Sequence, residues 1–204
     1  MMSLRKILSL LIIAVMLASA SAAHADTPAQ AVVRNFYTQL TASMKQGNQL
    51  GFSGRYKKLD PAIRSAFNLP LMTKAAVGAS WSEASPQEQA DLVSAFSDFS
   101  VSTYASRFAS YNDEQFTVAD EKPTDGGAVI VETTLKPKEG DSVSLNYLMR
   151  QDDKGKYRIV DVYINGTISE LATRRAEFSS IARRDGIAAL VNSLGEKSKQ
   201  MGPS

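Results

Sequence analysis

Hydrophobic residues in the first part of the chain recur every three or four positions, which is the period of an amphipathic α-helix. The first stripe follows Pro28, a residue type favoured in the first turn of a helix, and ends near Gly47. Its members are Val33, Phe36, Leu40 and Met44. The pattern predicts one helix here, followed by two shorter helices over residues 55–59 and 70–79.

A long helix is predicted to begin after Ser85. Ser85-Pro86-Gln87-Glu88 is a capping box with proline at the first helical position. The helix carries a stripe of large apolar residues: Leu92, Phe96, Phe99, Tyr104, Phe108 and Tyr111. Aromatic residues at helical spacing usually pack against a sheet, so we expect this stripe to belong to the core.

Alternation of period two then replaces the helical period. A short run contains Phe116 and Val118, and longer alternating runs cover residues 129–136, 142–150 and 157–164. The connectors between them are short and contain glycine. These features predict an antiparallel meander of four strands.

Two further helices are predicted after Asn165-Gly166, which ends the last strand. Thr167 and Glu170 form a second capping-box pattern, and Asp185-Gly186 separates a helix ending near Arg184 from a final helix. The order of helices, strands and helices predicts a single α+β domain, with several helices packed on one face of a curved, four-stranded antiparallel sheet.

Residues 1–25 are expected to be a signal peptide. Arg5 and Lys6 precede an apolar run that ends in small residues, and Ala23-His24-Ala25 matches a cleavage site. The apolar run is too short to cross a bilayer comfortably. We therefore expect a periplasmic protein whose mature domain covers residues 26–204.

The composition excludes several classes of function. The chain has 23 basic and 21 acidic residues, and the excess lies in the signal peptide, so nothing points to nucleic acid as a partner. It has no cysteine, and its only histidine is His24. Ser–His and Cys–His catalysis and an ordinary zinc site are thereby excluded from the mature chain, and we expect no metal and no cofactor.

Asp161 is the strongest candidate for catalysis in the remaining sequence. It lies near Tyr163, with Tyr147 on the neighbouring predicted strand, an arrangement in which a buried carboxylate could act as a base and a tyrosine as a hydrogen-bond donor. A hydrogen-bonded polar residue in a strand is the simpler interpretation, and we favour it. A secreted enzyme of the NTF2-like type and a non-transporting adaptor domain remain alternatives.

The face of the third predicted strand is apolar at Val143, Leu145, Tyr147 and Met149. Such a face closes as a dry core, or it leaves a cavity for an apolar ligand where the sheet curves away from the helices. The pattern alone favours core. Basic residues gather on the next helix as Arg174-Arg175 and Arg183-Arg184, and they are candidates for contact with a partner or a membrane surface.

Several stretches, taken in order, resemble the MlaC/toluene-tolerance family of periplasmic lipid-binding proteins. They are residues 77–81, 85–89, 146–150, 155–162, 165–169 and 174–178. The stretch 164–175 is most similar to the hopanoid-associated HpnM branch, and Tyr157 stands where the family often has tryptophan.

The resemblance implies a carrier without catalytic activity, which moves a hopanoid or a phospholipid between inner-membrane and outer-membrane transport proteins and touches membrane surfaces transiently. It also implies an MlaC-like fold with an NTF2- or cystatin-like layout. The residues expected to line the lipid pocket are Trp81, Phe96, Phe99, Val131, Val143, Leu145, Tyr147, Met149 and Tyr163. None is charged, so we expect recognition by shape, with any head group left in water at the mouth.

Overall fold

Two helix starts predicted in the N-terminal half, at Pro28 and after Ser85, are present in the computed structural model, which describes residues 25–202. Helix α1 (Pro28–Met44) begins with a capping box in which the Thr27 hydroxyl accepts a hydrogen bond from the backbone N–H of Gln30. Helix α5 (Pro86–Arg107) begins with the predicted box of Ser85 and Glu88. The predicted signal peptide lies outside the described residues, apart from Ala25.

The first of the helices between these two is longer than the sequence pattern predicts, whereas the second agrees with the helix predicted at 70–79. Helix α2 (Gly47–Ala66) replaces the predicted short helix at 55–59, and it contains a non-helical residue at Gly51 and a proline at Pro61. Its buried residues, Leu59, Ile63 and Ala66, continue the apolar face past the predicted end, so tertiary packing supports the added turns. Helix α3 (Leu69–Val77) and the short α4 (Ser80–Glu83) follow.

The sheet has five antiparallel strands in the order β1-β2-β3-β4-β5, which corrects the predicted number of four. The strands are β1 (Gln115–Pro123), β2 (Val129–Lys136), β3 (Val143–Gln151), β4 (Tyr157–Ile164) and β5 (Ile168–Ser169). The meander of the first four confirms the predicted topology.

The added strand depends on a turn at Asn165-Gly166. Both residues have positive φ, 53° and 74°, a conformation that asparagine and glycine adopt most readily. The turn reverses the chain, so that Ser169 pairs with Tyr163 on β4. Helix α6 (Glu170–Asp185) therefore begins at the N-cap Ser169, which accepts a hydrogen bond from Ala172, and the predicted cap at Thr167 is wrong.

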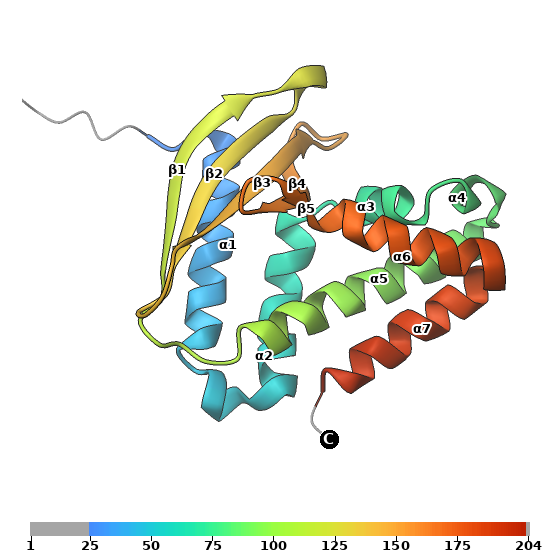
Figure 1. Cartoon of the computed structure of the whole chain (residues 1–204), viewed down its shortest axis with the longest axis horizontal. Coiled ribbons are helices and arrows are strands. Elements are labelled where there is room, and N and C mark those ends of the chain that lie inside the picture. The colour runs from blue at the N-terminus through green and yellow to red at the C-terminus, as the bar shows by residue number, and fades with distance from the viewer. Residues whose placement is uncertain (1–24, 203–204) are drawn as a thin grey trace, which may run out of the picture.

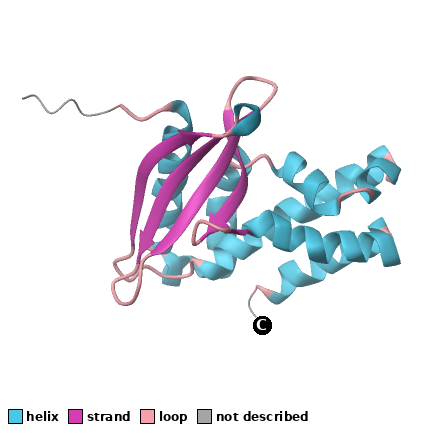
Figure 2. Ribbon diagram, turned by 45° about the horizontal axis from the view of Figure 1, so that its top comes forward, coloured by secondary structure: helices cyan, strands magenta, loops and turns pink. Residues whose placement is uncertain are grey.

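Helix α1 lies against the sheet, whereas α5, α6 and α7 (Ile187–Gln200) extend beyond the edge formed by β5 (Figures 1 and 2). Phe36 of α1 makes edge contacts with Phe67 and Tyr104, with ring centroids 5.3 Å apart in each pair. Phe178 of α6 packs between the rings of Phe96 and Phe99 of α5. The aromatic stripe of α5 thus contacts both halves of the molecule.

Candidate functional site

A cavity of about 140 Å³ lies between the sheet and the helices. The inner face of the sheet contributes Leu145 and Tyr147 of β3 and Val162 and Ile164 of β4. Helices contribute Tyr37 and Leu40 of α1, Ile63 of α2, Met72 of α3, and Phe96, Phe99 and Tyr104 of α5. The wall is therefore mostly aliphatic and aromatic, which suits an apolar ligand.

A bulge in β4 determines which residues of that strand face the cavity. Met149 pairs with Ile159, but Leu148 pairs with Asp161, so Val160 is an extra residue opposite the β3 ladder. Beyond the bulge, Val162 lies opposite Tyr147 and Ile164 lies opposite Leu145. These four side chains share one face, because directly paired residues of antiparallel strands point to the same side.

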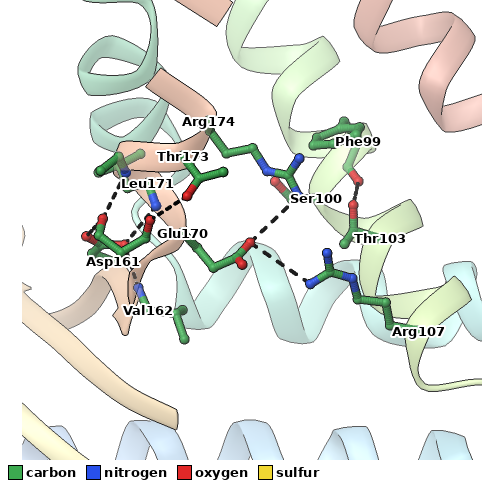
Figure 3. A network of polar contacts seen from close by, with 12 residues as sticks. Phe99, Ser100, Thr103, Arg107, Asp161, Val162, Glu170, Leu171, Thr173 and Arg174 are labelled. Carbon is green, nitrogen blue, oxygen red and sulfur yellow. Dashed lines mark hydrogen bonds and ion pairs between the residues drawn. The ribbon is translucent and has the colours of Figure 1, made fainter. Parts of the chain in front are cut away.

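The same bulge sends Asp161 to the other face. Its carboxylate accepts hydrogen bonds from the backbone N–H groups of Val162 at 2.7 Å and Leu171 at 3.0 Å, and from the Ser169 hydroxyl at 2.6 Å. Figure 3 shows Asp161 joined in this way to the start of α6. The residue is buried, and these contacts fit the structural role that we favoured from the sequence.

Tyrosine hydroxyls in the wall are held neutral. Burial raises the pKa of Tyr37 to about 12, although its hydrogen bond with Thr133, at 2.6 Å, acts in the opposite direction. Burial also raises the pKa of Tyr104 and of Tyr147 well above the usual value for tyrosine. The deep part of the cavity therefore carries no charge at physiological pH.

Charged residues gather at one edge of the cavity, and the sequence interpretation missed them. Arg107, Glu170 and Arg174 all line it, together with the hydroxyl residues Ser100 and Thr103 (Figure 3). Arg174 was assigned from the sequence to a partner surface, and Glu170 only to a capping box. Their common location arises because the C-terminal end of α5 lies beside the N-terminal end of α6, which no local pattern indicates.

Four of the nine residues predicted to line a lipid pocket lie at the cavity: Phe96, Phe99, Leu145 and Tyr147. Val131 and Met149 are completely buried in the core instead. Val143 lies at the first position of β3, paired with Leu135, and Trp81 lies on α4, partly buried against the core. Tyr163 alternates with Val162 and Ile164, so the β4 bulge places it on the opposite face.

The other arginines of α6 lie away from the cavity. Arg175, Arg183 and Arg184 are exposed, and Arg184 forms an ion pair with Asp185 at 2.6 Å. The four arginines of the two pairs do not share one face, because adjacent residues of a helix point in different directions.

Among residues 25–202, no group of three or more His, Cys, Asp and Glu side chains is arranged to hold a metal ion. The same part of the chain contains no helix with the length and apolarity needed to cross a membrane.

Comparisons with known proteins agree with this architecture. The family model described as MlaC protein matches residues 34–196. A solved structure of a phospholipid-binding protein from Ralstonia solanacearum, in complex with a phospholipid, superimposes with a TM-score of 0.73. It is 24% identical, and the match covers 85% of this chain and 98% of the other, so it shows a common fold. None of the curated proteins compared with the sequence matches it.

Proposed function

Because the chain belongs to the MlaC family, we propose that it is a periplasmic carrier that holds a lipid in the cavity between sheet and helices and moves it between the inner and outer membranes. The observation that carries this proposal is the cavity itself, whose deep wall is apolar and uncharged. The phospholipid bound to the structurally similar Ralstonia protein supports the same use of the fold.

Lipid transfer requires that the chains of the lipid be shielded from water, which is the role we propose for the apolar cavity. Burying one methylene is worth about 0.8 kcal/mol, so a lipid with about 30 methylenes faces a barrier on the order of 20 kcal/mol to diffusion through water. A carrier lowers that barrier by offering an apolar environment comparable to the membrane. Release then depends on the difference in affinity between donor and acceptor, so the function needs no covalent chemistry.

The ligand is either a phospholipid or a hopanoid. Likeness to the HpnM branch in the sequence supports a hopanoid, and a rigid polycyclic lipid loses less conformational entropy on binding than two flexible chains. The proposed partners are an inner-membrane lipid transporter and an outer-membrane acceptor or donor. Exposed Arg175, Arg183 and Arg184 are the proposed contacts with an acidic partner or an anionic membrane surface.

Organic extraction of the purified mature protein, followed by mass spectrometry, tests the proposal directly. We expect one lipid species at close to one molecule per chain, and the spectrum distinguishes hopanoid from phospholipid. Transfer of a labelled lipid between donor and acceptor vesicles tests the carrier role. Repeated preparations without lipid, and no transfer above the spontaneous rate, would support the adaptor domain instead.

A further inference from the structure

Two arginines and one glutamate meet where the apolar wall of the cavity reaches solvent. Arg107 is the last residue of α5, Glu170 is the first residue of α6, and Arg174 lies one turn further along α6. Oε2 of Glu170 lies 4.0 Å from a guanidinium nitrogen of Arg107 and 3.7 Å from one of Arg174 (Figure 3). One carboxylate oxygen thus faces two cations, and the cluster has a net positive charge.

The contacts of Glu170 with the arginines are loose. Both distances exceed those of a hydrogen bond, and the Arg107 side chain is more than half exposed. Ion pairs of this kind contribute little to stability, so an anion of higher charge density can replace the carboxylate at small cost.

Arg174 is held in place independently of Glu170. Its guanidinium carbon lies 4.9 Å from the centroid of the Phe99 ring, and Phe99 is itself part of the cavity wall. Stacking on an aromatic face positions a guanidinium while leaving its N–H groups available at the edge. The side chain therefore connects the apolar wall to the charged edge.

We propose that Arg107 and Arg174 bind the phosphate of a lipid head group whose chains occupy the cavity, and that this phosphate displaces the carboxylate of Glu170. The inference rests on the proposed lipid-binding function and assigns the residues that contact the head group. Guanidinium groups recognise phosphate through paired, charge-assisted hydrogen bonds. A neutral polycyclic lipid would leave both arginines without a ligand. This assignment replaces the sequence-based expectation that no charged group takes part in recognition.

The test compares two lipids with identical acyl chains, phosphatidylglycerol and diacylglycerol, by displacement of a fluorescent lipid from the full mature protein. We expect the wild type to bind phosphatidylglycerol more tightly. The double variant Arg107→Gln/Arg174→Gln should weaken phosphatidylglycerol binding about tenfold and leave diacylglycerol binding unchanged. The control Arg150→Gln/Lys154→Gln removes two exposed charges from the β3–β4 hairpin and should change neither affinity.

Glu170→Gln provides the opposite test, because it removes the competing carboxylate. We expect tighter binding of phosphatidylglycerol and unchanged binding of diacylglycerol. If the double variant fails to fold, the exposed Arg107→Gln change alone still tests the assignment, with an expected loss of several-fold. Equal affinities of the wild type for both lipids, or equal losses for both in the arginine variants, would overturn the inference while leaving lipid binding intact.

Failure of the wild type to bind either lipid would instead contradict the proposed function. Inorganic phosphate and glycerol phosphate are tested as competitors in the same displacement assay. We expect neither to displace the fluorescent lipid at millimolar concentration, because the chains supply most of the affinity. Displacement by inorganic phosphate with the same arginine dependence would show a site for free phosphate and would overturn the assignment to a head group.

Discussion

The carboxylate of Asp161 accepts a hydrogen bond from the hydroxyl of Ser169, with the two oxygens 2.6 Å apart. The same hydroxyl accepts the N-cap bond of α6 from Ala172. Asp161 also accepts from the backbone N–H of Leu171, so one buried carboxylate on β4 holds the first turn of α6 against the sheet. This turn carries Glu170 at the edge of the cavity.

We expect Asp161→Ala to cost about 2–4 kcal/mol of unfolding free energy, because it leaves buried donors unpaired. Asp161→Asn should cost less, about 1–2 kcal/mol, since the amide keeps one oxygen and can donate to Ser169. Chemical denaturation measures both values. Lipid binding by folded Asp161→Asn should be intact. A variant that binds lipid normally but loses a measurable turnover would favour the enzyme hypothesis.

Tryptophan should have opposite effects on stability and lipid binding at two positions of the sheet, one beside the cavity and one in the packed core. Leu145 lines the cavity, whereas Val131 is completely buried in the core. Leu145→Trp should fill the cavity and abolish lipid binding, with less than about 1 kcal/mol of destabilisation. Val131→Trp should destabilise the fold by at least 1–3 kcal/mol through overpacking.

Thermal melting and lipid binding, measured on both variants, distinguish cavity from core. If Leu145→Trp lowers the melting temperature as strongly as Val131→Trp, and its folded fraction still binds lipid, then Leu145 belongs to packed core and does not line the lipid site.

Local signals in the sequence predicted those parts of the fold that depend on neighbours along the chain. The Ser85 capping box, the apolar stripe after Pro28 and the glycine-containing connectors each act over a few residues, and the corresponding elements are confirmed. The fifth strand also has a local signal. Asn-Gly is the strongest short hairpin signal, but the sequence interpretation takes Asn165-Gly166 as a strand-to-helix connection, and the strand that follows it has only two residues.

Other features depend on contacts that a period-two pattern does not encode. Strict alternation along β4 places Asp161 and Tyr163 toward the helices, but the extra residue Val160 reverses the faces, so Val162 and Ile164 point into the cavity. The meeting of Arg107 with Glu170 requires the packing of two helices that are more than 60 positions apart in the chain. The apolar wall could therefore be predicted in part, and its charged edge could not.

Substitution by alanine should change the stability of the fold in opposite directions at two helical glycines. A Cβ atom at Gly47 would lie 1.8 Å from the carbonyl oxygen of Ala109, so the chain after α5 would have to move. At Gly195, inside α7, a Cβ atom would meet no atom within 4 Å beyond the neighbouring backbone of its own helix. We expect Gly47→Ala to destabilise by more than 2 kcal/mol, and Gly195→Ala to stabilise by about 0.5–1 kcal/mol through helix propensity. Denaturant midpoints measure both, and a neutral Gly47→Ala would contradict this close packing of α2 on the segment after α5.

The buried hydroxyl of Tyr37 makes the fold sensitive to alkali. Because burial raises its pKa to about 12 from an ordinary value of 10, the folded chain retains this proton between pH 10 and 12 while the unfolded chain loses it. The folded state then binds more protons, so stability falls as pH rises. The contribution of Tyr37 is fully present below pH 10, and about 2–3 kcal/mol is lost by pH 12.

Tyr37→Phe removes this titration. We expect the variant to lose about 1 kcal/mol at pH 7, since its hydrogen bond with Thr133 is gone, but to lose less stability than the wild type between pH 10 and 12. Thr133→Val is the matched control, because it removes the same hydrogen bond and keeps the titrating phenol. Its alkaline slope should equal or exceed that of the wild type, since the bond to Thr133 lowers the pKa of Tyr37. Urea unfolding at a series of pH values gives the slopes. Identical slopes for wild type and Tyr37→Phe would show that the Tyr37 hydroxyl reaches water, and that the cavity wall is open at this residue.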